Sequence, residues 1–152
     1  RYNDYKAATK FLKDMGIELV NREASNEKGY GNSITVDLTV EQPGKELKSF
    51  SVRGTVTEGL QMVSRIDEFD RLYFEPCGAT LFCLYDDRPG VIASISRKLA
   101  DAGINIEDMR NPHNTKTRRS LAIIKLNQPI SDDLVKVIKA DIMAHAAVCT
   151  VV

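Results

Sequence analysis

The sequence predicts an α+β fold in which a ferredoxin-like βαββαβ domain follows a smaller α+β domain. Residues 79–152 alternate as strand, helix, strand, strand, helix, strand, and each helix carries one apolar stripe. Because crossover connections are right-handed, this order implies an antiparallel sheet with both helices on one face. Immediately before this region, the residues Pro76, Cys77 and Gly78 interrupt the periodic pattern of apolar residues. We therefore expect domains at residues 1–77 and 78–152, the first not necessarily complete.

The first domain should begin with an amphipathic helix from about Asp4 to Met15, because its apolar residues share one face and Gly16 follows. Runs of strand-forming residues separated by turn residues come next. The acidic stretch from Asp67 to Asp70 separates the last two of these expected strands. The expected strands cover residues 17–22, 33–41, 46–54, 60–66 and 71–75.

The second domain has clear boundaries between its elements. Gly103 should end the first helix, and Ser131 is the expected N-cap of the second. A polar tip at residues 111–118 separates the two middle strands. The expected strands cover residues 79–85, 104–110, 119–126 and 146–152, and the first helix covers residues 91–102.

Composition excludes several classes of function. Lys plus Arg equals Asp plus Glu at 21 each, which argues against a nucleic-acid or membrane partner. No apolar run approaches the length of a transmembrane helix, and no secretory signal stands at the start. The odd number of cysteines, without CxxC spacing, fits a reducing cytoplasm better than disulfides or zinc. Because the first residue is Arg1 rather than Met, we expect a piece of a longer protein.

The sequence contains no recognisable catalytic constellation. A dinucleotide fingerprint, a P-loop and a triad-like grouping are all missing. Asp86 and Asp87 are adjacent, whereas a general acid and base must converge on one substrate atom. His113 and His145 are expected at the surface without a nearby nucleophile or metal ligand. We predict no catalytic and no metal-binding residues in this chain.

The segment from Leu81 to Met109 instead predicts a receptor for a small polar ligand. Pro89 and Gly90 should form a tight strand-to-helix turn, so that the amide groups of the helix start favour an anionic group such as a carboxylate. Asp87 offers an acceptor for an ammonium group, and Asn105 offers a donor and an acceptor. We expect Asn105 opposite Asp87. Alternatively, Asp87 only caps the helix and Asn105 only satisfies strand-end backbone groups.

The string DRPGVIASISRKLADAGINIEDM resembles the opening of an ACT domain, a ligand-binding module of many enzymes of amino-acid metabolism. Together with Tyr85 and the run at residues 103–106, it is similar in particular to the ACT domain of the D-3-phosphoglycerate dehydrogenase family, which binds L-serine. The resemblance implies an effector site at the interface of two subunits. The implied effector-binding residues are Tyr85, Asp87, Arg88, Pro89, Gly90 and Asn105.

The first domain resembles the allosteric substrate binding (ASB) domain of longer phosphoglycerate dehydrogenases and some serine dehydratases. The resemblance rests on YGNSITVDLTV and SVRGTVTEGLQMVSRIDEF. In that family basic residues hold an anion, and Arg65 and Arg71 resemble two of them. A further arginine of that cluster is missing, because the segment before Gly78 reads FEPC. The alternative is that both arginines are solvated charges near acidic neighbours.

These resemblances imply a regulatory fragment of a D-3-phosphoglycerate dehydrogenase that mediates feedback inhibition by L-serine and oligomerisation. We expect a homo-oligomer formed by pairing of ACT domains, no cofactor in this chain, and NAD in the catalytic domain of the parent protein. Three alternatives stay open. The first is the ASB and ACT portion of an L-serine dehydratase, although the Ser-Ser-His-Thr type motif of that enzyme is missing here. The other two are a stand-alone amino-acid sensor and an oligomerisation domain without an effector.

Overall fold

A computed structural model describes residues 5–18, 32–40 and 48–152. Its contacts divide the chain into two units, Arg1–Gly31 and Asn32–Val152. In the first unit, helix α1 (Tyr5–Asp14) confirms the predicted helix, and Gly16 follows it with a φ of +74°. The strand predicted from Ile17 to Arg22 lies largely outside the described residues.

Within the described residues, the second unit starts with an antiparallel sheet in the order β1-β2-β3-β4. β4 begins two residues earlier than predicted, because only Asp67 and Glu68 of the acidic stretch form the turn, in which Asp67 has a φ of +46°. Phe69 directly after this turn is buried and belongs to the strand. The strands are β1 (Ser33–Val40), β2 (Lys48–Thr57), β3 (Leu60–Ile66) and β4 (Phe69–Phe74).

The first sheet has one apolar face, as the alternation of β1 predicts. The register places Val36 beside Val52, Val52 beside Ile66, and Ile66 beside Phe69. Side chains of β1 and β2 on this face are exposed, whereas Phe69 is buried. The buried apolar residues of the sheet therefore lie on β4, with partly buried residues of β3 packed against them.

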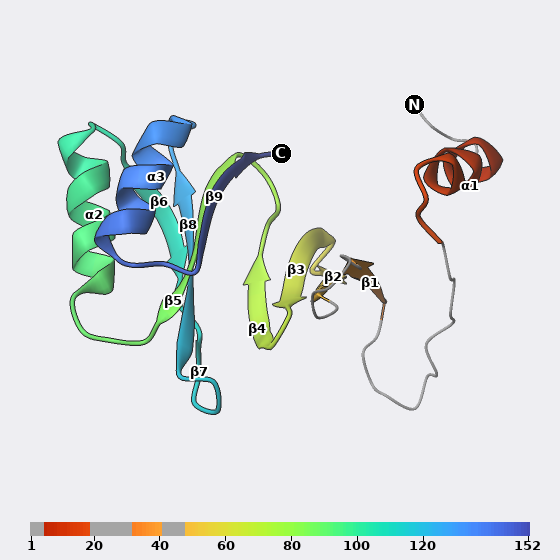
Figure 1. Cartoon of the computed structure of the whole chain (residues 1–152), viewed down its shortest axis with the longest axis horizontal. Coiled ribbons are helices and arrows are strands. Elements are labelled where there is room, and N and C mark those ends of the chain that lie inside the picture. The colour runs from red at the N-terminus through yellow and green to blue at the C-terminus, as the bar shows by residue number, and fades with distance from the viewer. Residues whose placement is uncertain (1–4, 19–31, 41–47) are drawn as a thin grey trace. The chain divides into compact units, whose positions relative to one another are not determined.

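The second sheet confirms the predicted ferredoxin-like βαββαβ architecture. Among the described residues its strands are antiparallel in the order β6-β8-β5-β9, and a two-residue strand, β7, pairs with β8 within the predicted polar tip. Helices α2 and α3 lie side by side against one face of this sheet (Figure 1). The elements are β5 (Ala79–Asp86), α2 (Val91–Asp101), β6 (Ile106–Arg110), β7 (His113–Asn114), β8 (Arg119–Leu126), α3 (Asp132–Asp141) and β9 (Ala146–Val151).

Each helix buries the stripe that the sequence predicts. Ile95 and Leu99 of α2 and Ile138 of α3 are completely buried against Leu81 and Ile124 of the sheet. Ser131 is the N-cap of α3, since its Oγ accepts a hydrogen bond from Leu134 N at 3.3 Å. The helices thus cover this face with an apolar core.

The opposite face of the second sheet packs against the first sheet. Phe69, Leu72 and Phe74 of β4 form a second buried cluster with Leu121 and Ile123 of β8. The predicted boundary between residues 77 and 78 lies in the short connection between the two sheets and stays a prediction. Among the helices of the described residues, none is long and apolar enough to cross a membrane.

Candidate ligand-binding site

The loop between β5 and α2 is a tight turn, as Pro89 and Gly90 predict. Gly90 has a φ of +89°. Residues with a Cβ adopt this left-handed backbone conformation only at a cost in free energy. Arg88 donates a hydrogen bond from its guanidinium to the carbonyl oxygen of Ile142 at 2.6 Å. Arg88 therefore ties the loop to the C-terminal end of α3.

The helix start of α2 has no side-chain cap among the described residues. Gly90 is the N-cap residue, and its carbonyl accepts from Ser94 N at 2.9 Å. The alternative that Asp87 caps this helix is therefore wrong. The amide groups of the first turn remain suited to an anionic group beside the loop.

The carboxylate of Asp87 points toward β8 and the hairpin that precedes it. Its Oδ1 accepts a hydrogen bond from Ser120 Oγ at 2.9 Å, and its Oδ2 lies 3.5 Å from Nδ1 of His113. The Asp87 amide donates to the carbonyl of Arg118 at 2.9 Å. Ser120 is completely buried, whereas the Asp87 side chain is 45% exposed. Asp87 is thus held in place but stays accessible to a ligand.

Tyr85 is buried in the helix-facing core, and its hydroxyl donates to Oδ1 of Asn111 at 2.7 Å. Burial is the main cause that raises the pKa of this hydroxyl, and the hydrogen bond with Asn111 partly opposes it. The hydroxyl therefore keeps its proton at neutral pH. Its position fixes the start of the hairpin at residues 111–118 to the end of β5.

Sequence reasoning missed that His145 contacts the end of β5 and that His113 contacts the loop that follows it. His113 reaches Asp87 because β7 pairs with the start of β8, which lies beside the end of β5. His145 Nε2 lies 2.8 Å from Oδ1 of Asp86, and this hydrogen bond is the main cause that lowers the pKa of the Asp86 carboxyl. Knowledge of the β5–β8 register would have revealed the first contact.

Asn105 does not lie opposite Asp87 in one chain, so that expectation is wrong. Asn105 precedes β6 and is placed by Asn127, whose Oδ1 accepts from Asn105 N at 2.9 Å. The register puts Ile106 beside Leu126, whereas Asp86 pairs with Arg119 at the other end of β8. At about 3.3 Å per residue, the two ends of β8 are roughly 23 Å apart. One chain therefore cannot bring Asn105 and Asp87 to one small ligand.

The predicted anion site at Arg65 and Arg71 lies on the hairpin of β3 and β4. The Arg65 guanidinium donates to the carbonyl of Asp67 at 3.0 Å and to Ser51 Oγ at 2.6 Å. Its buried Nε has no partner among the described residues. Arg71 is exposed and has a φ of +56°. Arg65 thus links β2 to the hairpin, and the anion site stays a prediction.

The described residues include no cluster that could bind a metal ion, since none of them forms a suitable group of three or more His, Cys, Asp or Glu side chains. The three cysteines form no disulfide, and burial raises the pKa of the Cys83 thiol to about 12.

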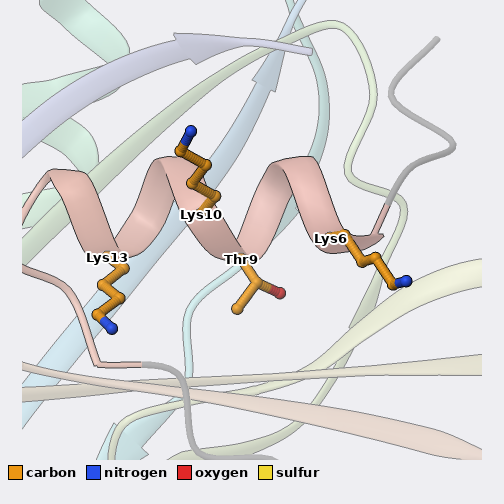
Figure 2. A pocket seen from close by; sticks show the side chains of 4 residues that line it. All are labelled: Lys6, Thr9, Lys10 and Lys13. Carbon is orange, nitrogen blue, oxygen red and sulfur yellow. The ribbon is translucent and has the colours of Figure 1, made fainter.

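An open hollow on α1 is a poor fit for an amino acid. It is lined by Lys6, Thr9, Lys10 and Lys13 (Figure 2). This lining includes no carboxylate to receive an ammonium group. The loop between β5 and α2 is the candidate site because it contains the predicted residues Asp87, Arg88, Pro89 and Gly90.

Comparison with known proteins agrees with this architecture. Residues 79–110 match the ACT domain family, so the chain contains an ACT domain, and the preceding four-stranded sheet is consistent with an ASB-like domain. The chain is similar to D-3-phosphoglycerate dehydrogenase of Methanocaldococcus jannaschii, with 28% identity over 127 residues that cover 84% of this chain and 23% of that protein. The corresponding enzyme of Bacillus subtilis shares 27% identity over 125 residues, which cover 82% of this chain and 23% of that protein.

A third relative is D-3-phosphoglycerate dehydrogenase of a Synechocystis species, with 24% identity over 134 residues that cover 88% of this chain and 23% of that protein. The chain thus spans about a quarter of the length of the relatives it matches, and the match lies in their carboxyl-terminal part.

Proposed function

We propose that this chain is the regulatory region of a cytoplasmic D-3-phosphoglycerate dehydrogenase, and that its ACT domain binds L-serine or another small α-amino acid as a feedback effector. The proposal rests on the similarity to the carboxyl-terminal part of such enzymes. In this proposal NAD and the catalytic residues belong to the remainder of the longer protein.

The observation that carries the proposal is the chemistry of one loop. Asp87 presents an accessible carboxylate, and the start of α2 a few residues later presents amide groups without a side-chain cap. A carboxylate suits an ammonium group, and a helix start suits a carboxylate. In this proposal the ammonium group of an α-amino acid binds Asp87, and its carboxylate binds the amide groups at the start of α2.

Asn105 would complete the site from a second copy of the chain. It lies at the far end of β8 from Asp87, so the two residues can share a ligand only across an interface. A two-fold interface brings such a pair together twice, because each copy supplies Asp87 to one site and Asn105 to the other. In this proposal the ligand links two subunits and favours one arrangement of the oligomer, with a coupling of about 1–3 kcal/mol.

Titration calorimetry with L-serine tests the binding. Asp87→Asn should weaken binding by about 10-fold or more, since a hydrogen bond to a charged group contributes roughly 1.5–3 kcal/mol. Asp86→Asn is the matched control, because this neighbouring carboxylate contacts His145 and should leave the affinity unchanged. Wild-type protein that shows no heat change with millimolar L-serine or with any other small α-amino acid would rule the proposal out.

A mixing experiment tests the shared site. Asp87→Asn and Asn105→Ala should each bind L-serine poorly, but mixed dimers contain one site with both native residues. After subunit exchange, an equal mixture should bind about one quarter as much ligand per chain as the wild type. No recovery of binding in mixtures that demonstrably exchange subunits would show that the two residues do not act across an interface.

A further inference from the structure

Asp87 fastens the hairpin at residues 111–118 to the loop of the candidate site. Its amide donates to the Arg118 carbonyl, and its carboxylate contacts Ser120 through Oδ1 and His113 through Oδ2. Ser120 is completely buried, whereas the His113 side chain is 49% exposed. The carboxylate therefore has one fixed partner and one partner that can be exchanged.

We propose that His113 competes with the ammonium group of the effector for Oδ2 of Asp87. This inference rests on the proposed function, because it requires that Asp87 receives the ammonium. Ser120 already occupies Oδ1 at 2.9 Å, so the ligand would approach the oxygen that His113 faces. An exposed pair of this kind is weak, whereas a ligand held also through its carboxylate can displace the imidazole.

Displacement of His113 gives the hairpin a way to respond to the ligand. The base of the hairpin stays attached through the hydrogen bond from the Tyr85 hydroxyl to Oδ1 of Asn111, which is 2.7 Å long. Its tip is organised around Asn114, whose Oδ1 accepts from the amides of Lys116 and Thr117. Because His113 and Asn114 form β7, release of His113 should loosen the tip while the base remains fixed.

Only molecules in which His113 does not occupy Oδ2 can bind the effector. The apparent affinity is therefore the intrinsic affinity multiplied by the fraction of such molecules. We expect His113→Ala to bind L-serine about 2- to 5-fold more tightly than the wild type in titration calorimetry, the range set by a weak exposed pair. His113→Gln, which keeps a hydrogen-bond donor but not the imidazole ring, should have an affinity between the two.

His145→Ala is the matched control, because it removes the same side chain from a similar pair with the neighbouring Asp86. Its affinity for L-serine should equal that of the wild type. In the wild type, L-serine should also speed hydrogen exchange at residues 113–118. An affinity of His113→Ala that is equal to or weaker than that of the wild type overturns the competition alone, whereas wild-type protein without any heat overturns the proposed function.

Discussion

Asp86 and Asp87 are adjacent in sequence, yet each carboxylate contacts a different histidine. Asp86 ends β5 and meets His145, which precedes β9, whereas Asp87 turns toward Ser120 and His113. Successive residues at a strand end point in opposite directions. At the scale of single residues, Asp86 therefore links the end of β5 to the start of β9, whereas the carboxylate of Asp87 can bind a ligand.

The pair of Asp86 and His145 should make stability depend on pH. Its hydrogen bond holds the pKa of the Asp86 carboxyl below its ordinary value of 3.8. The folded protein thus favours the ionised carboxylate, so the contribution is present above pH 3.8 and is lost as the pH falls through the lowered pKa. We expect His145→Ala to lower the Tm at about pH 6, with a difference from the wild type that narrows in acid.

Thermal melts monitored by circular dichroism measure this difference. In an Asp86→Asn background, His145→Ala should change the Tm much less, because the partner is already gone. A Tm difference of the same size at about pH 6 and about pH 2 would exclude this hydrogen bond as its source.

At the scale of elements, the turn before α2 depends on the backbone of Gly90. A Cβ added there would meet no atom within 4 Å, so the cost of a side chain comes from the φ of +89° alone. We expect Gly90→Ala to lower the free energy of unfolding by about 1–2 kcal/mol in urea denaturation.

Gly54→Ala is the matched control for this substitution. Gly54 has no left-handed φ, and a Cβ there would lie 3.9 Å from the Met62 carbonyl, an ordinary contact. Its effect should be the smaller of the two. Equal urea midpoints for Gly90→Ala and the wild type would show that the turn tolerates a side chain.

The sequence predicted elements better than it predicted their meeting points. The apolar stripe of α2 and the cap at Ser131 are local signals, and both were correct. Asn105 was wrongly placed, because its position relative to Asp87 depends on the direction of β6 along β8. His113 was missed for the same reason, since its contact follows from the pairing of β7 with β8 rather than from neighbours in sequence.

At the scale of the whole second unit, the ACT sheet has two covered faces. Helices α2 and α3 cover one face, and β4 contributes three buried side chains to the other. Phe74 and Phe82 meet edge to face with ring centroids 6.0 Å apart, across the boundary between the sheets. The four-stranded sheet is therefore part of the same buried structure as the candidate site.

This shared core predicts that the two sheets unfold together. Phe74→Ala should lower the free energy of unfolding by about 3–5 kcal/mol, because Phe74 is buried, while Tyr73→Ala on the same strand should cost well under 1 kcal/mol, because Tyr73 is 50% exposed. Urea denaturation should show one transition for the wild type and one, at lower urea, for Phe74→Ala. Two transitions in Phe74→Ala, the second with the wild-type midpoint, would instead show that the ACT domain is stable without the first sheet.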